Sequence, residues 1–272
     1  MILSRIDLFP IKSLDGVSVA AVRINPAGIL EHDRVFAILD AAGSYVNGKR
    51  TDRVHLIRTA FTEDYREASF WIQGETHRQN FVLEEPGAIN RWLSDYFGFA
   101  VQFVCEPTSG FPDDRAAPGP TIVGRESLQE VVRWFPELTY EEARRRFRSN
   151  LELGGVEPFW EDRLFGAANE LKAFRIGDVS FLGHNPCQRC AVPSRNPESG
   201  NQTPRNFQKR FMALRKERLP SWTNMERFNH YYRLAVNTSI PGSEAGKILR
   251  VGDAVHLSGY DGEFRDGRPD CE

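Results

Sequence analysis

Short apolar runs that alternate with polar positions dominate the first hundred residues, and this is the pattern of half-buried β-strands. Residues 17–25 carry β-branched side chains in partial alternation. Residues 34–46 form two apolar runs around an Ala-Ala-Gly turn, and residues 68–85 repeat this arrangement around Gln73-Gly74-Glu75. Paired runs separated by turn residues predict β-hairpins.

The period of the apolar positions changes after Pro86. Ile89, Leu93 and either Tyr96 or Phe97 lie at helical spacing, and a proline suits the first position of a helix. Strand patterns return in "VQFVCEP" from Val101 and continue after residue 170. The later runs are "FRIGDVSFLGH" (174–184), "YYRLAVNTSI" (231–240) and "KILRVGDAVHL" (247–257).

Three further helices are predicted from capping signals in the second half of the chain. Ser127 with Glu130, and Thr139 with Glu142, have the spacing of a capping box. Thr203-Pro204 has the form of an N-cap followed by the first helical residue, ahead of "RNFQKRFMALRKERL".

These elements predict a mainly β protein with some α structure. Strands and helices do not alternate regularly, so a doubly wound parallel sheet is not expected. Residues 106–121 are rich in Pro, Gly and Asp, which indicates a domain boundary or a mobile flap. We therefore divide the chain into domains 1–105 and 106–260, with a flexible tail at 261–272.

Composition and charge exclude several classes of protein. The 272 residues suffice for one large or two medium domains. A net charge of -2 and a pI near 6.3 do not indicate nucleic-acid binding or a polybasic membrane surface. No apolar run reaches the length of a membrane span, and Arg5 and Asp7 interrupt the candidate signal sequence. We expect a cytoplasmic protein with no membrane partner.

The stretch "HNPCQRCAVPSRNPESG" (184–200) places Cys187 and Cys190 three residues apart. A zinc site would need a second ligand pair of similar spacing, and the sequence has none. A thioredoxin-like dithiol would begin a helix, which Pro193 prevents from extending. The pair could also be two core thiols with no chemical role. Arg189 favours the thiolate form of a neighbouring cysteine, so one of the two cysteines could also be a metal ligand.

Several segments resemble the MOSC domain, named for the C-terminal part of molybdenum cofactor sulfurases. The resemblance lies in "RRFRSNLEL", "RIGDVSFLGHNPCQRCAVPSRNPESG" and "ILRVGDAVHLSG". Residues 8–46, from "LFPIKS" to "GSYV", are similar to the β-barrel domain that precedes MOSC. The plan is similar to that of the mitochondrial amidoxime-reducing components and their bacterial relatives, to about residue 260.

The resemblance implies a molybdenum cofactor (Mo-molybdopterin) with Cys190 as the metal ligand and catalytic residue. A thiolate is a soft donor that suits such a metal, and Arg189 beside it could meet anionic oxygens. A buried phosphate needs cations. The implied cofactor contacts are Lys12, Ser13, Arg34, Arg148 and Asn150, with Arg50 as an additional candidate. Each of these could instead be an ordinary surface or strand-end residue. Gln188 and Gly124 depart from the hydroxyl residues that relatives often carry.

The implied activity is reduction of small N-hydroxylated substrates. The sequence lacks iron–sulfur, flavin, dinucleotide and haem motifs, so electrons would come from a separate reductase and carrier. His184 and His230 are candidate proton donors, although a structural histidine fits both. The alternative is a carrier of the cofactor or of sulfur without turnover, and a third possibility is a binding module whose metal site has decayed. Pyridoxal phosphate binding is associated with the family as a whole, and no residue of this chain is assigned to it.

Overall fold

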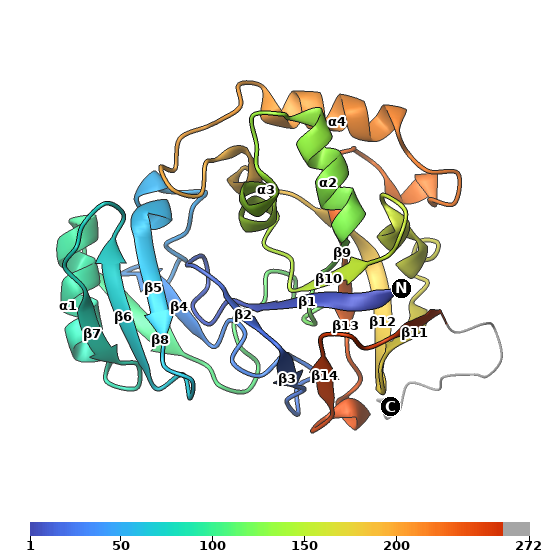
Figure 1. Ribbon diagram of the computed structural model, residues 1–272. Helices are drawn as coiled ribbons and strands as arrows, with labels where there is room; N and C mark the ends of the chain where they lie inside the picture. Colours follow the sequence, from blue (N-terminus) through green and yellow to red (C-terminus); the bar gives the residue numbers. More distant parts are fainter. Residues whose placement is uncertain (258–272) are drawn as a thin grey trace.

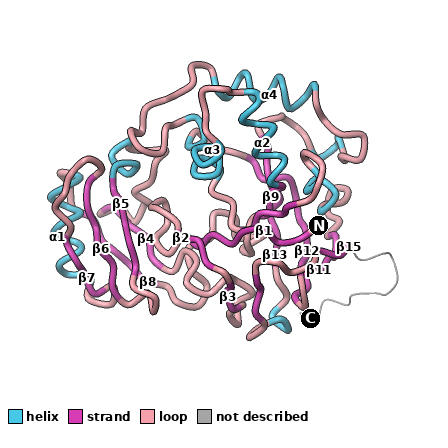
Figure 2. The backbone as a smooth tube through the Cα atoms, viewed as in Figure 1, coloured by secondary structure: helices cyan, strands magenta, loops and turns pink. Residues whose placement is uncertain are grey.

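The computed structural model describes residues 1–257. Two groups of strands lie side by side, with α2, α3 and α4 packed over one of them and α1 over the other (Figure 1). Loops run between the two groups in the middle of the molecule (Figure 2). The predicted tail at 261–272 and Cys271 lie outside the described residues. Among residues 1–257, no helix combines the length and the apolar character needed to cross a membrane.

The larger group is built on a sheet of order β15-β11-β12-β13-β9-β10-β1-β2. Its pairs are antiparallel, except that β9 and β10 run parallel. The strands are β1 (Ile2–Leu8), β2 (Val17–Val19), β9 (Ile122–Gly124), β10 (Leu151–Gly154), β11 (Lys172–Ile176), β12 (Val179–Gln188), β13 (Arg233–Ser239) and β15 (Val255–Leu257). A separate pair joins β3 (Ala21–Arg23) to β14 (Ile248–Arg250).

The smaller group comprises two sheets and one helix. In one sheet β4 (Phe36–Asp40) pairs with β8 (Val101–Cys105). The other sheet has the order β5-β6-β7, from β5 (Ile57–Phe61), β6 (Glu67–Ile72) and β7 (Gln79–Val82). The predicted hairpin over 68–85 is thus confirmed as β6 and β7. Residues 34–46 form less of a hairpin than expected, because β4 pairs with β8 and only Leu39 bridges back to Tyr45.

The described residues form three apolar cores, which do not follow the order of the chain. One of them joins α2, α3 and α4 to the strands of the larger group. The core of the larger group takes Leu3, Ile6 and Val22 from the start of the chain, together with residues from Ile122 to Val255. The core of the smaller group runs from Ile11 to Phe103. The first strands therefore belong to the same packed unit as the second half of the chain.

The helices confirm some sequence signals and correct others. Helix α1 (Pro86–Phe97) begins at the predicted proline. Helix α3 (Tyr140–Phe147) has the capping box of Thr139 and Glu142. Helix α2 (Arg125–Trp134) begins two residues before Ser127, so the capping box predicted there is wrong. Helix α4 (Phe207–Glu217) begins after the predicted Thr203-Pro204, because Thr203 instead accepts hydrogen bonds from Arg146.

The predicted fold class is confirmed: the protein is mainly β, with a β-barrel-like N-terminal domain and a few helices at the periphery.

Candidate functional site

A cavity of about 1340 Å³ opens between the two groups of strands. The segment after β1, the loop over 109–119, the end of α3 and the end of β12 all contribute to its wall. The sequence-predicted residues that line it are Lys12, Ser13, Arg34, Arg148, Asn150, Arg189 and Cys190. The fold therefore brings together residues that are up to 178 positions apart in the sequence.

Arg50 differs from the other predicted contacts because it does not line this cavity. Its guanidinium is half exposed and lies 2.7 Å from the carboxylate of Asp40. It also donates to the carbonyl of Tyr45. Its partners are on the neighbouring turn, so the structure gives Arg50 a local role.

Three of the lining residues have left-handed backbone conformations. The φ angles are 75° at Ser13, 53° at Arg34 and 49° at Arg148. Residues other than glycine adopt this region at a cost of order 1–3 kcal/mol, and such strain concentrates at functional sites. Arg148 has this conformation as the C-cap of α3, whereas Ser13 and Arg34 lie in turns of the cavity wall.

Lys12 and Arg34 are buried cations that share an acidic neighbour. Lys12 Nζ donates to the carbonyl of Phe111 at 2.8 Å, and both Lys12 and Arg34 pair with Asp113. Burial lowers the pKa of Lys12, with Asp113 acting against this. Burial also opposes the charge of Arg34, but its ion pair with Asp33 outweighs this effect and raises the pKa of Arg34.

Among Lys12, Arg34 and Arg148, the last has the fewest polar partners within residues 1–257. Its guanidinium stacks over the ring of Phe9 at 4.2 Å, and it has no ion pair or side-chain hydrogen bond within residues 1–257. Burial, and then the nearby charge of Arg34, lower the pKa of Arg148 to about 10. It is still protonated at neutral pH, so it is a cation available to an anionic ligand.

The side-chain amide of Asn150 forms hydrogen bonds with protein groups of the cavity wall. Its Nδ2 donates to the carbonyl of Asp7, and its Oδ1 accepts from Arg34 at 3.1 Å. The backbone N–H of Thr121 also donates to Oδ1. Asn150 therefore joins β1 and the start of β9 and fixes the guanidinium of Arg34.

Both cysteines of the pair are free thiols that line the cavity. The backbone N–H of Val192 points at Cys190 Sγ, 3.5 Å away. Cys187 lies in β12, and burial raises the pKa of its thiol. Within residues 1–257, no group of three His, Cys, Asp or Glu side chains gathers where it could hold a metal ion.

Arg189 fastens the turn between the two cysteines to neighbouring elements. It donates to the carbonyls of Leu234 and Phe147 at 2.9 and 2.8 Å, and to Ser149 Oγ at 3.3 Å. Phe147 directly precedes Arg148, so the side chain of Arg189 fixes the position of Cys190 relative to Arg148. Its donors are thus engaged with protein groups, and the sequence did not indicate this.

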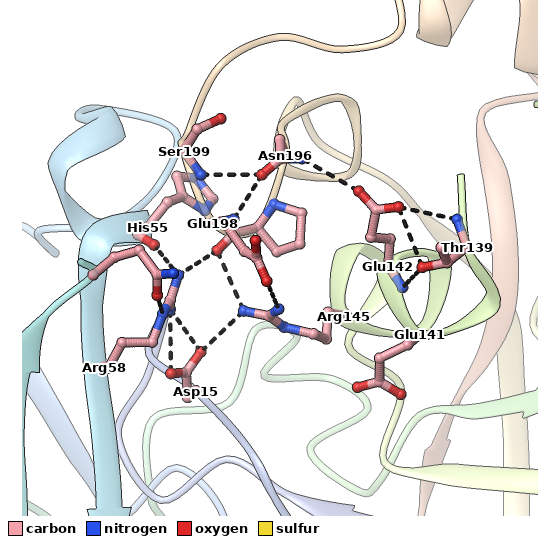
Figure 3. A network of polar contacts seen from close by, with 12 residues as sticks. Asp15, His55, Arg58, Thr139, Glu141, Glu142, Arg145, Asn196, Glu198 and Ser199 are labelled. Atoms are coloured by element: carbon pink, nitrogen blue, oxygen red, sulfur yellow. Dashed lines mark hydrogen bonds and ion pairs between the residues drawn. The ribbon is translucent and has the colours of Figure 1, made fainter. Parts of the chain in front are cut away.

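The segment after Cys190 is clamped across the cavity by a polar network (Figure 3). Arg58 donates to the carbonyl of Pro197 at 2.7 Å and to Asp15 at 3.0 Å. Arg145 pairs with Glu198 at 3.1 Å. The network joins β5 and α3 to residues 196–199, so elements of both groups hold the chain a few residues after Cys190.

Sequence reasoning missed Asp113, His55 and Arg58 as lining residues. The sequence shows two adjacent acids, Asp113 and Asp114, in a proline-rich loop, but their partners are about a hundred residues away.

The candidate proton donors His184 and His230 do not line the cavity. His184 bonds with Ser239, and His230 accepts from the N–H of Tyr232, which are structural roles. Gly124 caps α2 and does not line the cavity either.

Comparison with known proteins identifies both halves of the chain. Residues 1–99 match the model of the MOSC N-terminal beta barrel domain, and residues 121–256 match that of the MOSC domain. The tail boundary and the boundary at residue 105 remain predictions.

Two curated relatives are named molybdenum cofactor sulfurase. The protein from Drosophila grimshawi is 25% identical over 74% of this chain, and that from Arabidopsis thaliana is 24% identical over 73%. The chain spans 29% of the length of each. A solved structure described as "Crystal structure of an hypothetical protein" has 17% identity over 56% of both chains, with a TM-score of 0.31.

MOSC domains are connected with the handling of the molybdenum cofactor, and the names of these relatives agree with that connection. The domain matches cover most of the described chain, and the MOSC match includes the cysteine pair and the Arg-Ser-Asn segment at 148–150. The chain therefore belongs to the MOSC-domain family, with a MOSC N-terminal β-barrel domain ahead of the MOSC domain.

Proposed function

We propose that this protein binds a molybdopterin-type molybdenum cofactor and reduces N-hydroxylated compounds with electrons from a separate reductase and carrier. One observation carries the proposal. The thiol of Cys190 lines a cavity that also contains Lys12, Arg34 and Arg148. A soft metal donor and a cluster of cations in one enclosure are what an anionic metal–pterin cofactor requires.

The residues present fit such a group. Lys12, Arg34 and Arg148 would hold the phosphate, and Arg148 has no competing protein partner among the described residues. Cys190 would bind the metal through Sγ, with the N–H of Val192 supporting its negative charge. Single-ligand pockets usually enclose about 300–1000 Å³. A cavity of about 1340 Å³ leaves room for a small substrate beside a cofactor.

The bound cofactor would supply the two electrons that, with two protons, convert an N–OH group to N–H and water. The chain's own groups would orient the substrate and keep the cofactor in place. Arg189 and the clamp of Arg58 and Pro197 would hold the thiol-bearing segment rigid. This rigidity matters because catalytic groups must stay within a fraction of an ångström of their productive positions.

The second candidate function is a carrier that holds the cofactor or a sulfur atom without turnover. The names of the two curated relatives favour it, since both are cofactor sulfurases. An accessible free thiol at Cys190 could also hold a persulfide. The same cavity serves both functions, so turnover is the property that separates them.

The test begins with protein made in a host that synthesises the cofactor. We expect molybdenum and pterin in a one-to-one ratio to protein, and reduction of a hydroxylamine with an artificial electron donor but not with NADH alone. Bound cofactor without reduction would favour the carrier. Zinc, or no metal at all, would contradict the reductase and the carrier of the cofactor, and would leave only a carrier of sulfur.

The two cysteines provide a matched pair of variants. Cys190→Ser replaces a soft thiolate with a hard, largely protonated hydroxyl, so metal binding through this atom and reduction should be lost. Part of the pterin should remain through its phosphate contacts. Cys187→Ser should retain most of the metal and activity, with a stability cost of about 1 kcal/mol. Equal and complete loss in both variants would indicate a paired-thiol mechanism instead.

A further inference from the structure

Residues 112–118 form part of the cavity wall and have little backbone support. The N–H of Phe111 donates to Arg34 at 2.8 Å, and that of Gly119 donates to Thr238 at 2.9 Å. Between these anchors, residues 112–118 make no backbone–backbone hydrogen bond with any described residue. The position of this segment therefore depends on its side chains.

Two neighbouring acids hold the segment down. Asp114 accepts a single hydrogen bond from Asn237 at 3.3 Å. Asp113 pairs with Lys12 and with Arg34, and the positive charge of Arg148 also acts on it. The main polar attachment of residues 112–118 is therefore one carboxylate that pairs with two cations and lies near a third, and the buried Ala117 adds an apolar contact.

Arg34 has two acidic partners that differ in burial. The side chain of Asp33 is only 5% exposed, and it also accepts from the N–H of Phe9 at 2.8 Å. The side chain of Asp113 is 74% exposed and extends into the cavity from a loop. Asp33 is thus built into the wall, whereas Asp113 can leave without opening the core.

Asp113 is an anion at neutral pH. The surrounding cavity walls raise its pKa, but the charges of Arg34 and Lys12 outweigh them and hold the pKa well below its usual range. It therefore neutralises part of a cluster in which Lys12, Arg34 and Arg148 would otherwise repel one another. A phosphate group carries more charge and more acceptor oxygens than one carboxylate, so it can compete for the same cations.

We propose that Asp113 is a displaceable internal counter-ion, which occupies the Lys12–Arg34–Arg148 cluster until a phosphate-bearing ligand replaces it and releases residues 112–118. The inference rests on the proposed function in taking that ligand to be the pterin phosphate. Two consequences of opposite sign follow. Removing the charge of Asp113 should strengthen phosphate binding and lower the stability of the ligand-free protein.

The test uses the full chain made in a host without the cofactor, with inorganic phosphate as the probe in titration calorimetry. Asp113→Asn should bind phosphate about tenfold more tightly than the natural protein, because the competing charge is gone. Its melting temperature without phosphate should fall. Asp114→Asn removes the same charge one residue away, and its phosphate affinity should stay within about twofold. Asp113→Ser repeats the test should the amide variant fold poorly.

A double variant locates the effect. Adding Arg148→Met to Asp113→Asn should bring the phosphate affinity back to about that of the natural protein, since Arg148 is a cation of the cluster that has no polar partner within residues 1–257. Hydrogen exchange at residues 112–118 of the natural protein should increase when phosphate is added. Unchanged or weaker phosphate binding in Asp113→Asn, or a gain that survives Arg148→Met, would overturn the proposal. None of these measurements needs molybdenum or turnover, so they can succeed even where the reductase assay fails.

Discussion

His55 is a histidine of the cavity wall that must stay neutral. Burial, together with the positive charges of Arg195 and Arg148, lowers its pKa from 6.5 to about 4. The unfolded chain takes up this proton near pH 6.5, whereas the folded protein does so only near pH 4. Protonation therefore favours the unfolded state, and the folded state loses stability as the pH falls through this window.

This shift gives a prediction at the scale of one residue. Between pH 7.5 and pH 5, His55 should account for a loss of about 2 kcal/mol in the free energy of unfolding. Glutamine cannot titrate, so the free energy of unfolding of His55→Gln should fall over this interval by about 2 kcal/mol less than that of the natural protein. His77→Gln, at an exposed position, serves as the control and should match the natural protein. Identical pH dependence in all three proteins would contradict the assignment of a neutral, half-buried His55.

At the scale of elements, the same Ser/Thr-x-x-Glu spacing has two different outcomes. Thr139 and Glu142 form the capping box of α3. Ser127 instead lies inside α2, fully buried, where it donates to Glu161 at 2.7 Å and accepts from the N–H of Phe159 at 2.6 Å. Strand β9 runs directly into α2, so the helix begins before Ser127 can cap it.

We expect the two hydroxyl groups to differ in their contribution to stability. Thr139→Ala should lower the free energy of unfolding by about 1 kcal/mol, the usual value of an exposed cap. Ser127→Ala leaves two buried polar groups without a partner and should cost about 3 kcal/mol. Urea denaturation of both variants measures this directly. An equal loss near 1 kcal/mol in both would mean that Ser127 acts as no more than a cap.

Local signals predicted the elements that local interactions determine. Helix α1 and the β6–β7 hairpin follow from spacing, proline and turn residues within one short stretch. The partners of Asp113 lie about a hundred residues away, and no local pattern encodes such a contact. The site residues Lys12 and Arg148 were named through family resemblance, whereas Arg50 failed to reach the cavity because Asp40 on the same turn holds it.

At the scale of the whole molecule, the first three strands of the chain belong to the larger group, and the strands of the smaller group follow them in the sequence. Strand β1 lies between β2 and β10, and β3 pairs with β14. The side chains of Leu3 and Ile6 are fully buried in the same core as Val236. A fully buried aliphatic side chain contributes about 1.5–3 kcal/mol, and domains are stable by only about 5–15 kcal/mol. Residues 106–272 alone would lose several such side chains and two strand pairings.

The last prediction therefore compares two deletions. A fragment of residues 106–272 should not fold, whereas removal of residues 36–105 should leave a folded larger group. Phe36 and Cys105 are paired neighbours in β4 and β8, and the N–H of Glu106 donates to Val35 at 2.8 Å. A short Gly-Ser linker can therefore join Val35 to Glu106 without strain. Near-ultraviolet circular dichroism and cooperative urea unfolding would distinguish the two. Cooperative folding of the 106–272 fragment would show that β1 and β3 are dispensable, and a boundary near residue 105 would then separate two independent folding units.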